Sequence, residues 1–326
     1  MKKYIAYCLL AAATLLAACN DNFVEEVWRN DIGLKAIINS QGVTNVYLRY
    51  SKNGEVTYQL PVIVGGSVDN ARDIDVKIGV DPDTLPALNE ARWKLRTDLY
   101  FRQLEDKHYE FETPVCHIPA GQSTGTFDIK FKFSGLDLVD KWVLPLTILD
   151  DPSYQANPRK NYRKALLRVM PFNDYSGSYS STSMNVYISD NKNPMVTDSR
   201  TLFVVSENQC FFYAGVISEE LIDREKYKVV LTFNEDGTLG VAAADPKNEM
   251  GLQVQGTPTW SSRVRKDDVS SYIDHHYITV NLEYSYNDVT TYANQGYKIP
   301  YRAQGTMTME RKINTLIPDQ DQAIMW

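Results

Sequence analysis

The chain has 326 residues, and its 34 Lys and Arg stand against 41 Asp and Glu, which gives a formal net charge of −7. This acidic balance argues against nucleic acid and against a basic membrane-binding face, because both need clustered cations. The length is too great for one ordinary hydrophobic core and is natural for two domains.

The N-terminal segment has the features of an export signal. Lys2 and Lys3 precede an apolar run over residues 5–18. A membrane-spanning helix needs roughly 20 apolar residues, so this shorter run fits the central region of a cleaved signal peptide. We therefore expect residues 1–18 to be a signal peptide.

The apolar run ends at Leu16-Ala17-Ala18-Cys19, which is similar to the bacterial lipobox. The resemblance implies that Cys19 is lipidated and becomes the first residue of the mature chain. An ordinary signal peptide with an incidental cysteine is the alternative. One acyl chain anchors a protein weakly, whereas the several chains of a bacterial lipoprotein hold it stably.

Residues 19–31 are expected to form an acidic tether, in which Asp21, Glu25 and Glu26 follow the lipobox. Acidic residues at this place resemble the surface-export signal of Bacteroides-type lipoproteins. The resemblance implies an outer-membrane protein that is exposed at the cell surface, with the lipid as its attachment to the membrane. The rest of the sequence contains no second apolar run of spanning length.

Alternation of apolar and polar residues with a period of two dominates the first half of the mature chain. This period is typical of strands with one buried face. Asn53-Gly54 lies between the first two runs and is the strongest short signal for a hairpin. Short antiparallel strands of this kind favour a β-sandwich, which we place at residues 32–172. The strands are expected at 46–51, 56–64, 74–80, 109–111, 126–133, 143–149 and 164–170.

One helix interrupts these strands. Asp83 provides a cap and Pro86 lies in the first turn, which predicts a helix over residues 87–95. Asp83-Thr84-Leu85 also fits the short O-glycosylation pattern of Bacteroides-type exported proteins, but helix capping explains the same residues.

The second half alternates more regularly still, after a break at residues 170–177 (MPFNDYSG) where we place the domain boundary. About eight successive strands over residues 173–313 predict an up-and-down barrel, a form that removes exposed edges. Residues 314–326 are expected to be a C-terminal tail. The strands are expected at 178–188, 201–205, 211–216, 227–233, 239–244, 252–261, 277–286 and 301–310.

Several stretches carry a resemblance to a known family. In the first half, LYFRQLEDKHYEF, IPAGQSTGTFDIKFKF and KWVLPLTILD resemble the Ig-like N-terminal domain of Bacteroides-group surface lipoproteins. In the second half, GSYSSTSMNVY and YRAQGTMTMERKI are similar to the calycin-like barrel found behind that domain. The resemblance implies an all-β protein, an Ig-like sandwich followed by a calycin-like up-and-down barrel. It also implies glycan-uptake machinery of the starch-utilisation kind, without ligand residues to carry over.

No catalytic constellation emerges from the sequence. Gly121-Gln122-Ser123-Thr124-Gly125 has the G-x-S-x-G pattern of α/β-hydrolases, but that motif needs a helix after it, and strand-like alternation follows here. A hairpin turn is the better interpretation. A glycoside hydrolase needs two carboxylates across a cleft, and no acidic residue stands in a recognisable signature. We expect no enzymatic activity and no cofactor.

A polar cluster in the second half suggests a metal site, because Asp267, Asp268, Asp274, His275 and His276 lie close together in the sequence. On a strand, however, His275 and His276 point to opposite faces and cannot both bind one ion without a bulge. Asp274 and His276 could share a face, but two ligands do not make a closed site. We expect a polar loop that enters a strand, and no metal.

Cysteines and a calcium-like turn complete the search for chemistry. Cys116 and Cys210 fall in different predicted domains, so we expect buried thiols instead of a disulfide, even in an oxidising location. Asn234-Glu235-Asp236-Gly237 lacks the spaced ligands of a calcium loop and is predicted to be a turn.

Aromatic residues give the one positive indication of a ligand. Tyrosine combines a flat apolar ring with a polar tip, which suits it to lie against a sugar ring. Tyr284 and Tyr286 share the apolar face of a predicted strand, so we expect them in the core. The candidate glycan contacts are the aromatic residues in or beside loops: Trp260, Tyr272, Tyr292 and Tyr297.

The sequence therefore predicts a non-catalytic surface lipoprotein that binds a polysaccharide or oligosaccharide, or helps to capture it, as part of an outer-membrane glycan-uptake complex. A structural or adhesive lipoprotein that holds a protein partner is the first alternative. A glycoside hydrolase with an unrecognised carboxylate pair is the second.

Overall fold

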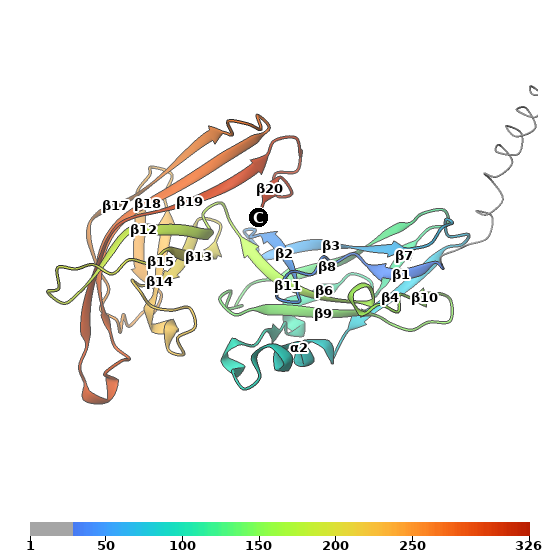
Figure 1. Ribbon diagram of the computed structural model, residues 1–326, viewed down its shortest axis with the longest axis horizontal. Coiled ribbons are helices and arrows are strands. Elements are labelled where there is room, and N and C mark those ends of the chain that lie inside the picture. Colours follow the sequence, from blue (N-terminus) through green and yellow to red (C-terminus); the bar gives the residue numbers. More distant parts are fainter. Residues whose placement is uncertain (1–28) are drawn as a thin grey trace, which may run out of the picture.

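The computed structural model describes residues 29–326, which form an all-β protein as predicted (Figure 1). The predicted signal peptide (residues 1–18) and the predicted lipidation site Cys19 lie outside the described residues. Two hydrophobic cores organise the rest, one built from residues 32–169 and the other from residues 179–309. Within residues 29–326, no helix has the length and apolar character needed to cross a bilayer.

The first half is a sandwich of two sheets. One sheet has the strand order β10 (Gln155–Ala156), β1 (Asp31–Leu34), β3 (Glu55–Val64), β8 (Thr124–Lys132) and β6 (Tyr109–Phe111). The other has the order β2 (Thr44–Arg49), β11 (Lys164–Phe172), β9 (Trp142–Ile148), β4 (Ile74–Val80) and β7 (Val115–Ile118), with β5 (Arg102–Gln103) beside β9.

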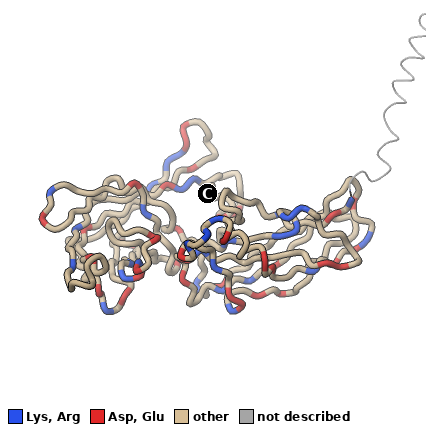
Figure 2. The backbone as a smooth tube through the Cα atoms, turned by 60° about the horizontal axis from the view of Figure 1, so that its bottom comes forward, with Lys and Arg blue, Asp and Glu red and all other residues tan. Residues whose placement is uncertain are grey.

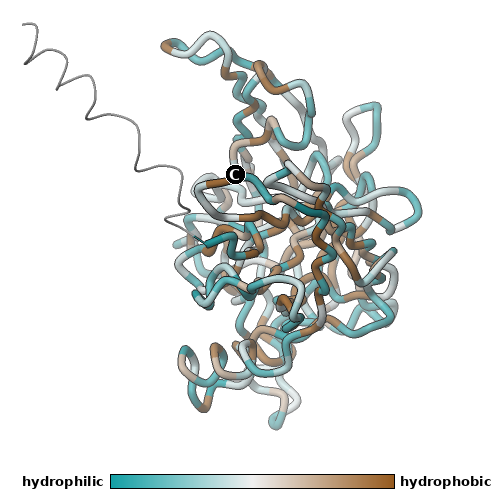
Figure 3. Tube along the Cα trace, turned by 90° about the vertical axis from the view of Figure 1, so that its right-hand side faces the viewer, coloured by the Kyte–Doolittle hydropathy of each residue, from teal (hydrophilic) through white to brown (hydrophobic). Residues whose placement is uncertain are grey.

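The sandwich core follows from the period-two alternation. Phe127, Ile129 and Phe131 of β8 all point inward and are almost fully buried, while the residues between them stay half-exposed. Figure 3 shows the same alternation of hydrophobic and hydrophilic residues along many strands.

Helices are short and lie outside the two sheets. Among residues 29–326 the largest is α2 (Thr84–Trp93), which begins three residues before the predicted start. Asp83 is its N-cap residue, but the Asp83 side chain forms no hydrogen bond to the helix. The others are α3 (Lys160–Arg163) and the 3₁₀ turns η1 (Thr97–Leu99), η2 (Asp106–His108), η3 (Arg224–Tyr227) and η4 (Ala293–Gln295).

The G-x-S-x-G stretch is a turn, as predicted, but it does not close a hairpin. β7 before it pairs with β4, and β8 after it pairs with β3, so the turn carries the chain from one sheet to the other. Gly121 takes a φ of +76° there, a conformation that glycine adopts without steric cost. No helix follows, so Ser123 does not stand on a nucleophile elbow.

The second half is a sheet of nine strands curled into a nearly closed barrel. The pairing of β12 with β19 joins the first barrel strand to the last long one. At the other seam an isolated bridge links Thr238 to Thr259. The strand order is β16 (Leu239–Ala243), β15 (Lys228–Phe233), β14 (Gln209–Tyr213), β13 (Ser199–Ser206), β12 (Gly177–Ile188), β19 (Ile299–Asn314), β18 (Ile273–Asp288) and β17 (Gln253–Lys266), with β20 (Ile324–Met325) beside β19.

Three strands of the barrel continue beyond it (Figure 1). β12 follows β19 as far as the Ser180–Thr308 pair, and β16 reaches β17 at Thr259. The pairing of β17 with β18 and of β18 with β19 runs on to Lys266, Asp274 and Asn314. We call these extensions (261–266, 273–279 and 308–314) the projecting sheet. The predicted tail folds back against it, because β20 pairs with Lys312 and Ile313.

Candidate functional site

A cleft of about 460 Å³ lies between the sandwich, the projecting sheet and the linker that joins the two domains (residues 173–176). Its volume falls within the range of small-molecule sites, which often form where two domains meet. The sandwich contributes Arg49, and the C-terminal tail contributes Gln320 and Ile324. The other lining residues are Asp174, Tyr175, Trp260, Ser262, Arg263, Val264, His276, Tyr277, Ile278, Met309, Arg311 and Ile313.

One face of the projecting sheet forms a wall of the cleft. Val264, His276 and Arg311 are direct neighbours across β17, β18 and β19. Their side chains share one face, because successive residues of a strand point to opposite sides. Arg263 and Tyr277 also border the cleft, but by the same alternation their side chains point to the outer face of the sheet, where the guanidinium lies 4.8 Å from the centre of the tyrosine ring.

Aromatic rings close the cleft on the barrel side. Trp260 and Tyr175 both line it, with ring centroids 5.2 Å apart and planes at 81°. Phe233 stacks against Tyr175 at 4.1 Å from the core. The Trp260 indole N–H donates to the Asn234 carbonyl at 2.8 Å, which fixes the ring. The two partly exposed rings therefore form a rigid apolar corner.

Charged groups also line the cleft. The Arg49 guanidinium bonds the Asp174 carboxylate at 2.7 Å and the Asp321 carboxylate at 2.7 Å. Burial lowers the pKa of Arg49, but its hydrogen bonds to the two carboxylates outweigh this effect and raise the pKa above the ordinary value. Arg49 thus joins the sandwich to both the linker and the tail.

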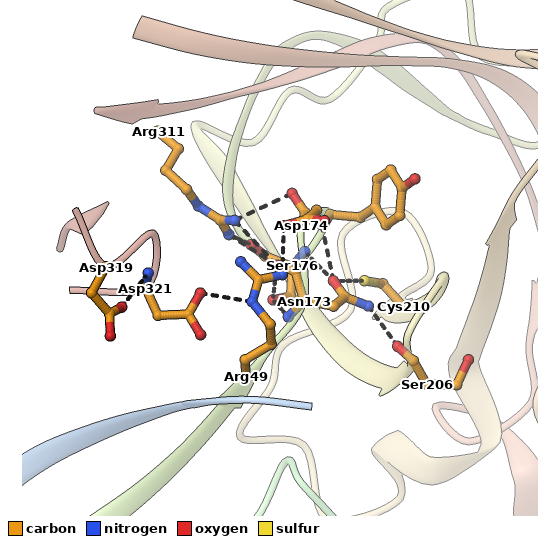
Figure 4. A network of polar contacts seen from close by, with 10 residues as sticks. Arg49, Asn173, Asp174, Ser176, Ser206, Cys210, Arg311, Asp319 and Asp321 are labelled. Atoms are coloured by element: carbon orange, nitrogen blue, oxygen red, sulfur yellow. Dashed lines mark hydrogen bonds and ion pairs between the residues drawn. The ribbon is translucent and has the colours of Figure 1, made fainter. Parts of the chain in front are cut away.

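The linker between the domains is held by its own hydrogen bonds (Figure 4). The Asn173 amide donates to the carbonyls of Ser206 and Gln209, and its oxygen accepts the backbone N–H groups of Tyr175 and Ser176. These bonds tie the linker to β13 and β14, so the buried amide is fully used.

Arg311 holds the same linker from the other side. Its guanidinium donates to the backbone carbonyls of Asn173, Asp174 and Ser176, the shortest at 2.7 Å. Burial lowers the pKa of Arg311 from its ordinary value, while the Asp174 carboxylate opposes that shift. Arg311 serves as a structural brace at the back of the cleft.

The structure separates the four aromatic residues that the sequence proposes as glycan contacts. Trp260 lines the cleft, on β17 and not in a loop. Tyr272 precedes β18, whereas Tyr292 and Tyr297 follow its other end. Because β18 has 16 residues at about 3.4 Å each, Tyr272 lies about 50 Å from the other two. Tyr292 and Tyr297 contact each other, with ring centroids 6.2 Å apart.

The predicted polar cluster becomes a set of local pairs. His275 lies on the outer face of the projecting sheet, between the Asp267 carboxylate at 2.9 Å and the Glu310 carboxylate. His276 faces the cleft, so the two histidines point to opposite sides as predicted. In the part of the chain that the structure describes, no three His, Cys, Asp or Glu side chains are arranged to hold a metal ion.

Other residues that the sequence singles out are buried. Cys116 and Cys210 are free and buried, in separate cores, as predicted, and burial raises the pKa of their thiols to about 11 and about 12. Thr84 of the O-glycosylation pattern is also buried, and its hydroxyl accepts a hydrogen bond from Lys164 at 3.0 Å. Tyr284 and Tyr286 lie in the barrel core, as predicted.

A wider hollow of about 1040 Å³ lies beside α2, and two of its polar side chains have local hydrogen-bond partners. The Asn89 amide bonds the backbone of Phe101, and the Tyr100 hydroxyl donates to the Lys94 carbonyl. These groups stabilise the helix and the turn after it. The interdomain cleft is the better candidate, because aromatic and polar groups from separate elements converge there.

Sequence reasoning missed most of the cleft. Arg49 sits in a strand that alternates like any other, and Arg311 and Ile324 lie in segments whose partners are distant in the chain. Tyr175 could have been identified from the sequence, because it is an aromatic residue inside the polar linker segment MPFNDYSG. Asp174 carries the one carboxylate among the lining residues, and that carboxylate is bonded to Arg49.

Two domain families match the chain. Residues 23–152 match a domain of unknown function, DUF4973. Residues 163–308 match a family described as a C-terminal domain. No curated protein matches the chain.

Solved structures resemble the whole described chain. One is a Bacteroides ovatus protein of unknown function, with 46% identity and a TM-score of 0.84, covering 91% of this chain and 100% of that one. Another is a Bacteroides ovatus multidomain protein that includes DUF1735, with 45% identity and a TM-score of 0.83, covering 90% and 99%. A third is an auxiliary nutrient binding protein from Bacteroides thetaiotaomicron, with 34% identity and a TM-score of 0.78, covering 90% and 100%.

Proposed function

Because the chain belongs to the family of Bacteroides proteins that these solved structures represent, we propose that it is a non-catalytic surface lipoprotein whose interdomain cleft binds glycan. The observation that carries the proposal is the aromatic corner of Trp260 and Tyr175, which lines the same cleft as polar groups of separate elements.

The chemistry of the cleft matches that of a sugar. A pyranose ring has apolar C–H faces that pack on aromatic rings, and hydroxyls around its edge that need donors and acceptors. Trp260 and Tyr175 supply the apolar surface, and His276 and Gln320 supply polar groups within the same cleft. The Trp260 ring is already fixed by its bond to Asn234, so binding costs it little side-chain entropy.

The relatives support a role in nutrient capture. The Bacteroides thetaiotaomicron protein is described as an auxiliary nutrient binding protein, and it matches this chain over nearly its whole length. We extend that role to this chain as the capture of polysaccharide or oligosaccharide for an uptake complex. Lipidation at Cys19 would keep the cleft at the outer membrane, where such a complex takes up its glycan.

Affinity electrophoresis against a panel of plant, fungal and host polysaccharides tests the proposal. We expect at least one polysaccharide to retard the soluble chain that begins at residue 20. His276→Ala and Trp260→Phe should weaken the retardation, because both side chains line the cleft. Tyr292→Ala is the matched control, since Tyr292 is exposed at the far end of β18.

Two outcomes would count against the proposal. If no polysaccharide retards the wild-type chain, or if both cleft variants migrate like wild type, glycan does not bind in this cleft. Release of reducing sugar by the purified protein would contradict a non-catalytic role and would favour the hydrolase alternative.

A further inference from the structure

One edge of the projecting sheet has no neighbouring strand. β17 pairs with β18 without interruption from Thr259 to Lys266. On its other side, β16 reaches it at Thr259, and among residues 29–326 no strand pairs with Ser261–Lys266 there. The opposite edge of the projecting sheet differs, because β20 covers β19 at Lys312 and Ile313.

The direction of the free backbone groups follows from one hydrogen bond. The Trp260 N–H donates to the Gly237 carbonyl at 2.9 Å, so it points away from β18. Backbone groups alternate in direction along an antiparallel strand. Ser262, Val264 and Lys266 therefore direct their N–H and C=O groups outward, toward solvent.

The open edge is exposed and basic. All six residues from Ser261 to Lys266 are exposed, and the Val264 side chain is 56% exposed in spite of its apolar character. Arg263, Arg265 and Lys266 lie along this stretch. Arg263 lies over the Tyr277 ring, whereas Arg265 pairs with Asp268, and Lys266 pairs with Asp274 at 3.5 Å. All three cationic side chains are exposed, and exposed ion pairs of this kind contribute little and can exchange partners. Figure 2 shows basic residues along the projecting hairpin and acidic residues at its tip.

We propose that the open edge of β17 is a docking site for an extended acidic segment of a protein partner, which adds to the projecting sheet as one more strand. Unpaired edges of this kind are templates for strand addition, in which backbone hydrogen bonds supply affinity and alternate side chains supply specificity. The acidic charge of the partner complements Arg263, and it can replace Asp268 and Asp274 as the partner of the exposed Arg265 and Lys266.

The side chains along the edge also determine which residue types the added strand needs at alternate positions. On the outer face, the side chains of an added strand would lie beside Arg263 and Arg265, which favours acidic residues there. On the other face they would lie beside Ser262 and Val264 at the cleft, which favours small or apolar residues. The expected ligand therefore alternates acidic and apolar residues over about six positions, the length of the open edge.

A second copy of the chain is a poor occupant of this edge. Pairing two β17 edges would bring the cationic stretches of both chains together, and like charges directly opposite each other destabilise a sheet. Cations at an edge commonly prevent such self-association. The same cations attract a strand of opposite charge. Repulsion of a second copy and attraction of an acidic strand therefore both favour the acidic partner.

Fluorescence anisotropy with a labelled peptide tests the proposal on the soluble chain that begins at residue 20. The probe is a seven-residue peptide of alternating Glu and Val, and its counterpart has Lys in place of Glu. We expect the Glu peptide to bind, the Lys peptide to bind at least tenfold more weakly, and added salt to weaken the Glu complex. Failure of the Glu peptide to bind, or equal binding of both, overturns the proposal.

Two variants separate edge pairing from general attraction. Val264→Pro removes an outward N–H and leaves the β17–β18 bonds intact, so it should reduce binding at least tenfold in a folded protein. Val264→Thr keeps the N–H and should bind like wild type. Wild-type binding by Val264→Pro, or a dimer of the wild-type chain that Val264→Pro abolishes, overturns the proposal. Because Val264 also lines the cleft, peptide binding is measured in the absence of glycan.

Discussion

The indole ring of Trp326, the last residue of the chain, lies flat on the ring of Tyr47 in β2, with centroids 4.0 Å apart and planes 2° apart. Phe172 at the end of β11 meets the same indole edge-on at 4.8 Å, and the Arg311 guanidinium lies 5.4 Å from it. The C-terminal tail thus contacts the sandwich through this aromatic ring as well as through the Arg49–Asp321 ion pair.

Replacing that ring should loosen the junction of the domains. Trp326→Ala removes the stack on Tyr47 and the contact with Arg311, and should lower the free energy of unfolding by about 1–2 kcal/mol. Urea unfolding followed by circular dichroism measures the change. Met325→Ala is the control, because Met325 is similarly exposed but forms none of the aromatic contacts given for Trp326. Equal unfolding free energies of Trp326→Ala and wild type would show that the stack does not stabilise the protein.

Gly305 in β19 marks a close approach of two backbones. Its φ is +137°, and a Cβ there would lie 2.0 Å from the Ser183 carbonyl oxygen, beside the irregular register of β12. Gly305→Ala should therefore lower the unfolding free energy by about 2–3 kcal/mol, since backbone atoms must move.

Gly256→Ala isolates the conformational part of that cost. Gly256 also has a positive φ, but its Cβ would meet no atom within 4 Å. Thermal unfolding of both variants should show a loss of about 1 kcal/mol for Gly256→Ala and a larger loss for Gly305→Ala. A smaller loss for Gly305→Ala would contradict the close approach.

The two buried thiols should not react with thiol reagents in the folded protein. The thiolate is the reactive form, and burial raises the pKa of Cys116 to about 11 and of Cys210 to about 12. At pH 8 the chain that begins at residue 20 should react with a thiol reagent such as DTNB only after urea is added, and then at both cysteines. Rapid labelling of the native protein would refute this burial.

His275 should make the projecting sheet sensitive to pH. Its hydrogen bonds to Glu310, and then to Asp267, raise the pKa of the imidazole above its ordinary value, because the charged form gains two carboxylate partners. The stability that this gain contributes is complete below about pH 6.5, the unfolded pKa, and is lost as the pH rises through the higher folded pKa.

NMR titration of the imidazole and thermal unfolding across this range check the effect. We expect a folded pKa above 6.5 for His275 and a smaller loss of stability on going to alkaline pH in His275→Gln than in wild type. Asp267→Asn should lower the folded pKa of His275. Identical pH profiles of wild type and His275→Gln would contradict the coupling.

The fold was largely predictable, because burial leaves a period-two trace in the sequence. The predicted strands at 74–80 and 109–111 coincide with β4 and β6. The short strands β1, β7, β10 and β20 were not predicted, since each has two to four residues and depends on a partner from elsewhere in the chain. Pairing of that kind is tertiary and leaves little local pattern.

The cleft was harder to predict for a related reason. β18 was expected over 277–286 but extends over Ile273–Asp288, and β19 and β17 are also longer than expected. Their alternation fails where the strands leave the barrel core, because the inward positions there are His276, Arg311 and Ser262. The polar residues that ended the predicted strands are the ones that line the cleft.

The bonded linker between the two domains has a consequence for ligand affinity. Asn173 and Arg311 fix the linker, and a second set of ion pairs joins the domains where Lys228 and Arg224 meet Asp137 and Asp140. The two halves therefore meet as a preorganised unit. A ligand that enters the cleft need not order the two domains first, so less of its contact free energy is lost on binding.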